Sequence, residues 1–467
     1  MDLTNKSLSF FFVGIAGSGM SAIAKYLTGK GFSVSGSDRQ FTSENSEIRE
    51  KLEKLSIKTF LNNGEGISEN ISYVVVSSAI EESNPDLQKA KALSIPVLHR
   101  SEMLSVIVRN SKTIAISGTS GKSTVTAMVY HILEYAGFSP SLITGAGLVS
   151  LEKRGEIGNA VSGNGEWLVI EADESDGTLV RYFPEIGIIL NIDKDHKEIN
   201  ELKDIFKTFS ENVLNRGKIL LANGDNANAA CYVKDRKFLF GTDNSFAVQG
   251  VDFKALGTTI SFRLRYGGEL VKFEIPLPGY HNMENALAAA ACAVHAGVSL
   301  RTCAEALKTF PGIFRRHQIL GTFHGITLVD DFAHNPAKIA ASIQSVFPFT
   351  AGKVFAWFQP HGFTPTKFLR HELVKAIKES LRREDSICFS EIYYAGGTVA
   401  KDISANDLAE DLKALGVNAC YIKDRNEALE KIVHEAKPGD TILLMGARDP
   451  KLSQFACHVQ DLLEKKS

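Results

Sequence analysis

Short apolar runs alternate with amphipathic segments from residue 8 of the chain onward. The run SFFFVGIAG at 9–17 predicts a strand that leads into a turn, and SAIAKYLTGKG at 21–31 has the apolar spacing of a helix. FSVSGSD at 32–38 and YVVVSSA at 73–79 predict two further strands. Strands that alternate with helices in this way favour a parallel sheet with crossover helices.

The same alternation starts again twice further along the chain. A buried strand at 112–118 runs into a glycine-rich turn and a helix at 123–137, and a third series begins with a strand at 325–332. Between them, the polar stretch 241–275 predicts short antiparallel strands, and the alanine-rich stretch 278–297 predicts a helix. The other predicted elements are strands at 166–173, 185–192, 353–360, 386–392, 418–424 and 441–447 and a helix at 367–383.

Length and composition agree with a division into three parts. A chain of 467 residues is too long for one ordinary hydrophobic core, so we expect three α/β domains at 1–108, 109–312 and 313–467. Hydrophobic residues at 44% and charged residues at 23% are typical of a globular protein. A net charge of -2 supplies no field that attracts nucleic acid or an anionic membrane, so we expect neither as a partner.

The N-terminus and the cysteines indicate a cytoplasmic protein. Lys6 and the apolar run after it superficially resemble a secretory signal, but Gly14, Gly17 and Gly19 interrupt that run. No stretch approaches the ~18 consecutive apolar residues that span a bilayer. The six cysteines are scattered without a C-x-x-C pair, which favours reduced thiols over a disulfide framework or a zinc site.

The strongest chemical motif is the glycine-rich turn after the strand at 112–117. Glycines let successive backbone amides and a helix N-terminus face a phosphate, a lysine then reaches the terminal phosphates, and a hydroxyl ligates magnesium. The usual pattern has a glycine where this chain has Ile116, so the loop is a shortened form. It predicts binding of ATP and Mg²⁺ by Gly118, Thr119, Ser120, Gly121, Lys122, Ser123 and Thr124.

This shortened loop resembles that of the Mur ligases, ATP-dependent enzymes of three α/β domains that build the peptide stem of bacterial cell-wall precursors. The resemblance implies a Rossmann-like N-terminal domain, a central P-loop-type ATPase domain and a Rossmann-like C-terminal domain. In that family an acid and a histidine of the central domain complete the magnesium site. The resemblance implies that Ser123, Glu171 and His196 hold Mg²⁺ here, and Asp173 and Glu174 are alternatives to Glu171.

One more segment of the central domain resembles the nucleotide site of this family. Residues 278–286, PGYHNMENA, resemble the family's P-G-x-H-N-x-x-N-A segment, which implies that Asn285 hydrogen-bonds the adenine with Asn282 beside it. An amide suits this role because it donates and accepts at once. From the residues alone, the alternative for Asn282 is a helix cap.

The C-terminal domain contributes two motifs to the resemblance. Arg315 and Arg316 resemble a family Gly-x-x-Arg-Arg pair, of which one arginine reaches the ATP phosphates. Residues 330–336, DDFAHNP, match the D-Y-A-H-x-P signature, which implies that Asp331 meets the ribose and His334 lies close to the reacting carboxylate. The implied catalytic residues are therefore Lys122, Glu171, His196, Arg315, Arg316 and His334.

The first glycine-rich turn indicates the substrate of the N-terminal domain. The turn at 14–20, GIAGSGM, with an acid about 20 residues on, is a weak match to a dinucleotide-binding fingerprint. It resembles more closely the G-I-G-G-x-G-M of the UDP-N-acetylmuramate–L-alanine ligases within the family. That resemblance implies a site for the UDP-sugar substrate made by Gly17, Ser18, Gly19, Met20, Ser37, Asp38 and Ser78.

The resemblance implies joining of L-alanine to the lactyl carboxylate of UDP-N-acetylmuramate through an acyl phosphate, in peptidoglycan precursor synthesis. One region departs from the pattern: Gly362 and Pro365 replace the two arginines of the F-Q-P-H-R-Y-[ST]-R segment, and Arg448 stands where a glycine is expected. An arginine pair is a natural clamp for an amino-acid carboxylate. The alternative is therefore a related ligase with the same donor and another acceptor, either another amino acid or a recycled murein tripeptide.

Two other classes of function explain less of the sequence. A nicotinamide-dependent oxidoreductase accounts only for the N-terminal glycines and Asp38. A non-catalytic nucleotide-binding protein leaves the intact ATP motifs without a purpose. Because the reacting groups of a ligase come from different domains, we also expect the third domain to close over the central one when ATP binds.

Overall fold

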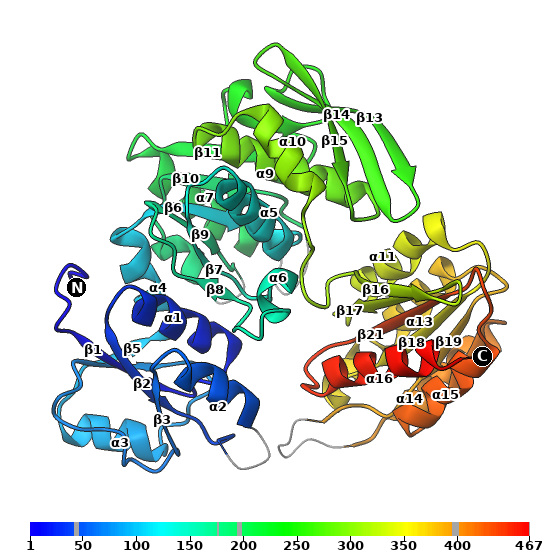
Figure 1. Ribbon diagram of the computed structural model, residues 1–467, viewed down its shortest axis with the longest axis horizontal. Coiled ribbons are helices and arrows are strands. Elements are labelled where there is room, and N and C mark those ends of the chain that lie inside the picture. The colour runs from blue at the N-terminus through cyan, green and yellow to red at the C-terminus, as the bar shows by residue number, and fades with distance from the viewer. Residues whose placement is uncertain (42–45, 175–176, 194–198, 395–400, 467) are drawn as a thin grey trace. The chain divides into compact units, whose positions relative to one another are not determined.

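The computed structural model describes residues 1–41, 46–174, 177–193, 199–394 and 401–466. Residues 1–254 and 260–312 form one compact unit, and residues 255–259 and 313–467 form a second (Figure 1). Three separate sheets with helices around them make up these units, so the prediction of an α/β fold is confirmed. No helix among the described residues is long and apolar enough to cross a membrane.

The first sheet has five parallel strands in the order β3-β2-β1-β4-β5. Phe10, Phe11 and Phe12 of its middle strand are fully buried, because helices or loops cover both faces. The strands are β1 (Ser9–Val13), β2 (Ser33–Ser37), β3 (Lys58–Phe60), β4 (Tyr73–Val76) and β5 (Val97–His99). The helices are α1 (Ser18–Gly29), α2 (Ser46–Glu53), α3 (Pro85–Ala92) and α4 (Arg100–Arg109).

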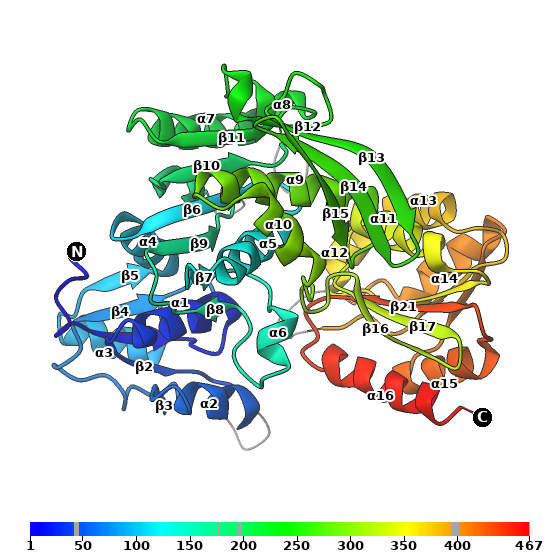
Figure 2. The same ribbon diagram turned by 45° about the horizontal axis from the view of Figure 1, so that its top comes forward.

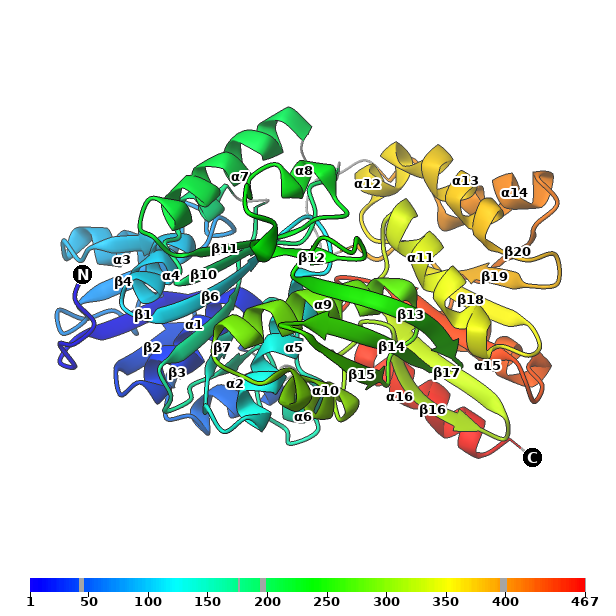
Figure 3. The same ribbon diagram turned by 90° about the horizontal axis from the view of Figure 1, so that it is seen from above.

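The second sheet has ten strands in the order β15-β14-β13-β12-β11-β10-β6-β9-β7-β8. Its strands are β6 (Lys112–Ser117), β7 (Ser141–Ile143), β8 (Ala160–Val161), β9 (Trp167–Glu171), β10 (Ile186–Ile189), β11 (Ile219–Asn223), β12 (Leu239–Gly241), β13 (Val248–Leu256), β14 (Thr259–Tyr266) and β15 (Glu269–Ile275). The helices are α5 (Lys122–Tyr135), α6 (Val149–Glu152), α7 (Ile199–Leu214), α8 (Ala227–Ala230), α9 (Tyr280–His295) and α10 (Leu300–Lys308). Helices α5, α9 and α10 pack together on one side of this sheet, and α7 lies on the other (Figure 3).

The region 241–275 differs in part from its prediction. Strands β14 and β15 are antiparallel, as expected, but the strands have seven to nine residues and are not short. Through the parallel pair β12–β13 they also continue the central sheet (Figure 2).

The third sheet has six strands in the order β16-β17-β21-β18-β19-β20, parallel except for β16. Its strands are β16 (Gln318–Phe323), β17 (Ile326–Asp331), β18 (Val354–Gln359), β19 (Ser386–Phe389), β20 (Asn418–Tyr421) and β21 (Thr441–Gly446). The helices are α11 (Pro336–Val346), α12 (Phe363–Phe368), α13 (Arg370–Ser380), α14 (Ala405–Ala414), α15 (Arg425–Glu435) and α16 (Leu452–Glu464).

The helix predicted at 367–383 is confirmed as α13 over 370–380, but its predicted first and last residues are wrong. The chain forms α12 and α13 here, and Leu369 between them has a φ of -94° and a ψ of 7°, which departs from helical geometry. The exposed Phe368 ends the first helix, and Leu381 leaves the second with extended backbone. Apolar spacing alone could not show this break, because Leu369 continues the helical pattern of the sequence.

Candidate active site

Two glycines set the shape of the turn between β6 and α5. Gly118 and Gly121 have φ values of 140° and 82°, which L side chains avoid. A Cβ on Gly121 would lie 2.7 Å from Asn285 Oδ1, and a Cβ on Gly118 would lie 3.0 Å from Leu190 Cβ. At these two positions the turn therefore has no room for a side chain. Its position before α5 fits a phosphate, because backbone amides and a helix N-terminus favour negative charge.

Asn191, which the sequence prediction did not include, holds this turn in place. It follows β10, the strand that pairs in parallel with β6. Its Oδ1 accepts hydrogen bonds from Thr119 Oγ1 and Ser120 N, both at 2.8 Å, and its Nδ2 donates to the carbonyl of Ser120 at 3.2 Å. Because this half-buried amide both donates and accepts, it fixes the loop before any ligand arrives.

The ammonium of Lys122 lies among oxygens at the start of α5. Its Nζ donates to the carbonyl of Gly118 and to Glu174 Oε2, both at 2.7 Å, and Asp173 Oδ1 is 3.8 Å away. Burial raises the pKa of Glu174 although the charge of Lys122 opposes it. A bound phosphate would compete with Glu174 for the lysine, and Glu174 becomes easier to protonate when the lysine leaves.

Ser123 and Glu171 meet at the carboxyl ends of β6 and β9. Ser123 Oγ donates to Glu171 Oε1 at 2.8 Å, and Thr144 Oγ1 and Gly145 N donate to Oε2 at 2.8 and 2.7 Å. A hydroxyl facing a carboxylate supplies the oxygen donors that Mg²⁺ prefers, so these two residues fit the ion. His196 lies outside the described residues, within which no three His, Cys, Asp or Glu side chains are close enough to hold a metal.

The two asparagines of α9 are arranged differently. Asn282 is buried, and its Nδ2 donates to the carbonyl of Pro278 at 2.7 Å, so it ties the first turn of the helix to the preceding loop. The N-cap residue is Gly279, so Asn282 is not the cap. Asn285 donates to Asn282 Oδ1 at 3.1 Å, and its own Oδ1 faces Gly121. Asn285 is therefore the one beside the phosphate loop.

In the N-terminal domain, the side chains of Asp38 and Ser37 are already hydrogen-bonded within the domain. Asp38 Oδ2 accepts from the amide of Ala16 at 3.0 Å, and its Oδ1 accepts from the amide of Gln40 at 2.9 Å. Ser37 Oγ donates to the buried Asp86 at 2.6 Å. These two predicted residues fix the glycine-rich turn to the end of β2.

The other predicted sugar-nucleotide residues lie at the ends of two neighbouring strands. Gly17 and Ser18 are exposed where α1 begins, and Gly19 is the next residue of that helix. The side chain of Met20 is buried in the core, so only its backbone can face a ligand. Ser78 is exposed after β4, which pairs with β1. The start of α1 and Ser78 thus stand at the same edge of the first sheet.

The adjacent arginines 315 and 316 differ in what they contact. Arg315 is buried, with Nε 3.0 Å from Asp330 Oδ2 and Nη2 donating to the carbonyl of Gly446 at 2.9 Å. Burial raises the pKa of Asp330 to about 6 although Arg315 opposes it. Arg316 is half-buried and lies 4.8 Å from the ring centroid of Phe332. The side chain of Arg315 is thus bound within the fold, whereas the guanidinium of Arg316 lies over an aromatic ring and its charge helps to lower the pKa of Asp331.

Asp331 and His334 follow the carboxyl end of β17. Burial alone would raise the pKa of Asp331, but His317 and a 2.7 Å hydrogen bond from Ser342 Oγ hold it below its usual range. His334 Nδ1 lies 2.8 Å from the carbonyl of Phe332, and since a carbonyl only accepts, Nδ1 carries the proton and Nε2 has the free lone pair. Burial lowers the pKa of His334 to about 4, helped by the charges around it. This histidine is neutral at pH 7.

His361, which was not among the predicted site residues, lies beside His334 with 5.4 Å between the ring centroids. Its Nδ1 and Gln359 Oε1 are buried polar atoms without a hydrogen-bond partner in the described part of the chain. Burial lowers the pKa of His361, and the charge of Arg448 lowers it further. Buried polar atoms without partners are uncommon, so this end of β18 has polar groups to offer to a ligand.

The departures at residues 362, 365 and 448 lie at this same edge. Gly362 has a φ of 71°, and a Cβ there would lie 3.2 Å from Pro365 Cδ. Arg448, just after β21, is exposed and has a φ of 62°, which is rare for a residue other than glycine. Since β18 and β21 are parallel neighbours, Arg448 is a cation at the edge where His361 lies.

Comparison with family profiles matches three consecutive stretches of the chain. Residues 9–112 match the Mur ligase family catalytic domain, 116–293 the Mur ligase middle domain, and 315–448 the glutamate ligase domain of Mur ligases.

Similar proteins match the chain over almost its whole length. The UDP-N-acetylmuramate–L-alanine ligase of Carboxydothermus hydrogenoformans is 35% identical over 95% of this chain and 94% of that protein. The protein of the same name from Geotalea uraniireducens is 37% identical over 93% and 94%. The crystal structure of a UDP-N-acetylmuramate-alanine ligase from Thermotoga maritima has a TM-score of 0.79 at 25% identity, with 97% and 98% covered. A murein peptide ligase from Psychrobacter arcticus shares the fold, with a TM-score of 0.67 at 20% identity over 98% and 99%.

Proposed function

Because the chain belongs to the Mur ligase family, we propose that it joins L-alanine to the lactyl carboxylate of UDP-N-acetylmuramate in peptidoglycan precursor synthesis. The family consists of ATP-dependent ligases, and this chain is one of them. The observation that carries the proposal is the phosphate loop, where Lys122 contacts Glu174 and Ser123 contacts Glu171, so that the start of α5 faces the carboxyl end of β9. An oxidoreductase would leave this arrangement without a use.

The first step transfers a phosphoryl group. An oxygen of the substrate carboxylate attacks the γ-phosphorus of ATP, ADP leaves, and an acyl phosphate forms. Lys122 breaks its contact with Glu174 and binds the phosphoryl oxygens instead. Together with the amides of residues 118–121, it stabilises the negative charge that develops on these oxygens. Ser123, Glu171 and His196 would hold Mg²⁺, which when bound offsets negative charge on the phosphates. We do not assign Asp173 or Glu174 to the metal, because Glu171 is the carboxylate that contacts Ser123.

Three more residues are assigned to ATP from the family resemblance. We assign Asn285 to the adenine, Asp331 to the ribose and Arg316 to the phosphates. Arg315 is excluded from ligand contact by its buried ion pair with Asp330, and acts by holding the segment that carries Arg316.

The second step forms the amide bond. The acceptor amine attacks the carbonyl carbon of the acyl phosphate, and phosphate leaves from the tetrahedral intermediate. We assign His334 to the amine: its free Nε2 accepts a hydrogen bond from the N–H and orients the nitrogen lone pair. With a pKa of about 4 it is a weak base, so positioning is its main contribution.

The N-terminal domain would bind the UDP-sugar. We assign the backbone of Gly17, Ser18, Gly19 and Met20 to the diphosphate, because the N-terminus of α1 favours an anion. Ser78, which follows the neighbouring strand β4, is assigned to the same ligand. Asp38 shapes this turn through its side chain and Ser37 through its backbone carbonyl, which accept hydrogen bonds from amides of the turn.

The region around Gly362 and Pro365 favours a second candidate, a ligase with the same donor and another acceptor. Neither residue can bind a carboxylate through its side chain. We assign binding of the acceptor's carboxylate to Arg448. His361 Nδ1 and Gln359 Oε1 are assigned as uncharged hydrogen-bond partners of the acceptor.

The deciding experiment measures phosphate release from MgATP and UDP-N-acetylmuramate with a panel of single L-amino acids and the murein tripeptide. The first candidate predicts the highest kcat/KM with L-alanine, and mass spectrometry should find one alanyl residue on the sugar nucleotide. Turnover with another acceptor but none with L-alanine would select the second candidate. Absence of ATP-dependent phosphate release with every acceptor would refute both. Arg448→Gln should raise KM for the acceptor and leave KM for ATP unchanged.

A further inference from the structure

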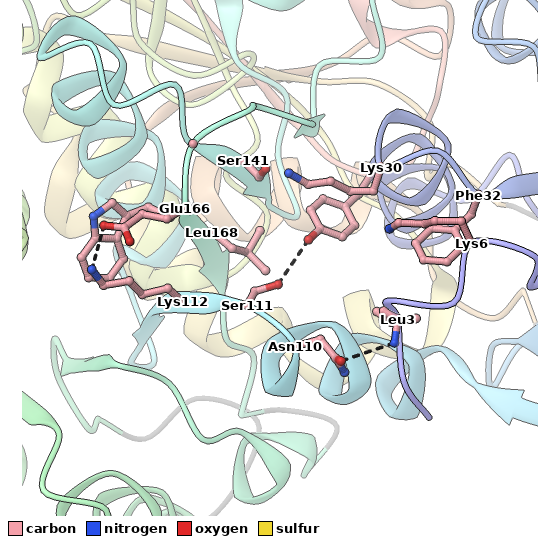
Figure 4. A pocket seen from close by; sticks show the side chains of 13 residues that line it. Leu3, Lys6, Lys30, Phe32, Asn110, Ser111, Lys112, Ser141, Glu166 and Leu168 are labelled. Atoms are coloured by element: carbon pink, nitrogen blue, oxygen red, sulfur yellow. Dashed lines mark hydrogen bonds and ion pairs between the residues drawn. The ribbon is translucent and has the colours of Figure 1, made fainter.

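A cavity of about 370 Å³ lies in the first unit away from the phosphate loop (Figure 4). The N-terminal segment, the end of α1, the link at 110–112 and the starts of β7 and β9 line it. Strands β6, β7 and β9 are parallel, and each reaches the cavity with its amino end. The phosphate loop follows the carboxyl end of β6, so this cavity lies at the opposite edge of the sheet from the ligase site.

The wall of the cavity carries more positive than negative charge. Lys6, Lys30 and Lys112 contribute three ammonium groups, and Glu166 contributes the one carboxylate. Lys112 Nζ pairs with Glu166 Oε1 at 2.7 Å. No ion pair forms at Lys6 or Lys30 within the part of the chain that the structure describes, and Lys30 Nζ donates to the carbonyl of Gly163 at 2.6 Å. Two positive charges therefore remain without a carboxylate.

Aromatic rings hold these two lysines in place. Lys6 Nζ lies 4.0 Å from the ring centroid of Phe32, and Lys30 Nζ lies 5.6 Å from that of Tyr26. Tyr26 is fixed in turn, since its Oη lies 3.2 Å from Ser111 Oγ. Figure 4 shows the side chains of Lys6 and Lys30 extending in the same direction from one side of the cavity. Burial lowers the pKa of Lys30, and repulsion by the charge of Lys6 lowers it further. An anion between them would remove this repulsion.

The turn at 163–165 beside the cavity is tightly packed, and one lining residue, Trp167, has an unsatisfied donor. A Cβ on Gly163 would lie 2.1 Å from the carbonyl oxygen of Ser139, and one on Gly165 would lie 1.8 Å from that of Phe138, so this turn requires glycine. Trp167, which lines the cavity, is 4% exposed, and its Nε1 is buried without a hydrogen-bond partner among the described residues. A buried N–H of this kind is uncommon and is usually satisfied by water or a ligand.

We propose that this cavity binds the phosphate group of a small phosphate monoester, with the anion between Lys6 and Lys30. A phosphate dianion matches the two uncompensated charges, and its oxygens accept hydrogen bonds that ammonium groups donate. The volume lies within the range of about 300–1,000 Å³ typical of small-molecule sites and exceeds what a bare phosphate needs. The monoester is therefore favoured over free inorganic phosphate. The site is independent of the proposed ligase activity.

The test is isothermal titration of the full chain with glycerol 3-phosphate and, separately, with inorganic phosphate. It uses the Lys122→Ala background, so that binding at the phosphate loop does not contribute. Glycerol 3-phosphate should bind saturably, and Lys6→Gln with Lys30→Gln should raise its Kd by at least about tenfold. The matched control removes two exposed lysines elsewhere, Lys58→Gln with Lys207→Gln, and should leave Kd unchanged.

Each outcome of the titration decides the proposal. Tighter binding of glycerol 3-phosphate than of phosphate supports the monoester, and equal binding assigns the site to free phosphate. No saturable binding of either, or equal binding by the double variant and its control, overturns the proposal. If the double variant unfolds, the single change at the exposed Lys6 replaces it, with a several-fold rise in Kd expected.

Discussion

Replacement of Gly121 by alanine tests whether the phosphate loop depends on its backbone shape. An L residue at a φ of 82° costs about 1–2 kcal/mol of folding free energy. The new Cβ would also lie 2.7 Å from Asn285 Oδ1, whereas ordinary contacts begin at 3.4 Å, so the loop or the asparagine must move by about 0.7 Å. Since a 1 Å misplacement costs up to about 100-fold in rate, we expect kcat/KM for ATP to fall about 10- to 100-fold.

The other end of the same helix supplies the control. Gly137 follows α5 with a φ of 80°, and no atom lies within 4 Å of the Cβ that an alanine would add there. Gly137→Ala should therefore lower stability as Gly121→Ala does, by about 1–2 kcal/mol, without changing kcat/KM for ATP. The assays are phosphate release with varied ATP and thermal unfolding of both variants. Equal kcat/KM in the two variants would refute a steric role of Gly121 in nucleotide binding.

Three further predictions follow from the burial of single side chains. Lys122→Ala should abolish ATP-dependent phosphate release and leave the protein folded; near-normal turnover would contradict the assignment of the loop. Arg315→Ala should cost about 3–5 kcal/mol of unfolding free energy, because it leaves a buried carboxylate without its partner. Arg316→Ala should instead raise KM for ATP. If Arg315→Ala and Arg316→Ala lowered the free energy of unfolding equally, the different roles of the two arginines would be contradicted. The pKa of His334, about 4, lies below the unfolded value of about 6.5, so the unfolded chain binds the proton more tightly between these values. The contribution of His334 to stability should therefore rise with pH between about 4 and 6.5 and stay constant above that range. An NMR titration of its ring with a midpoint near 6.5 would contradict the burial of this side chain.

Much of the fold could be predicted from local patterns, because parallel strands covered on both faces form continuous apolar runs. Phe10, Phe11 and Phe12 are an example: all three are fully buried, and their run marks β1 in the sequence. The phosphate loop was equally visible, since glycines, a lysine and a hydroxyl must follow one another there. The Ser123–Glu171 contact came from the resemblance, and the structure brings these two side chains to 2.8 Å.

What could not be predicted depends on which strands are neighbours. Asn191 belongs to the loop only because β10 pairs with β6, and no local pattern reveals that order. The arginines 315 and 316 are adjacent and chemically identical, so only their surroundings separate them. A positive φ of 53° directs Arg315 into the core against Asp330, while Arg316 stays near the surface of the domain.

The departures at Gly362 and Pro365 are best understood as one structural change. At a φ of 71°, residue 362 disfavours any L side chain, and a Cβ there would be in tight contact with the ring of Pro365, at 3.2 Å from its Cδ. Restoring an arginine at position 362 alone should therefore strain the loop and not rebuild a carboxylate clamp. Arg448 lies on the neighbouring strand end with its own positive φ, and its charge reaches His361. Recognition of the acceptor should accordingly be sought in Arg448 and His361, because the loop after β18 no longer offers a cation at positions 362 and 365.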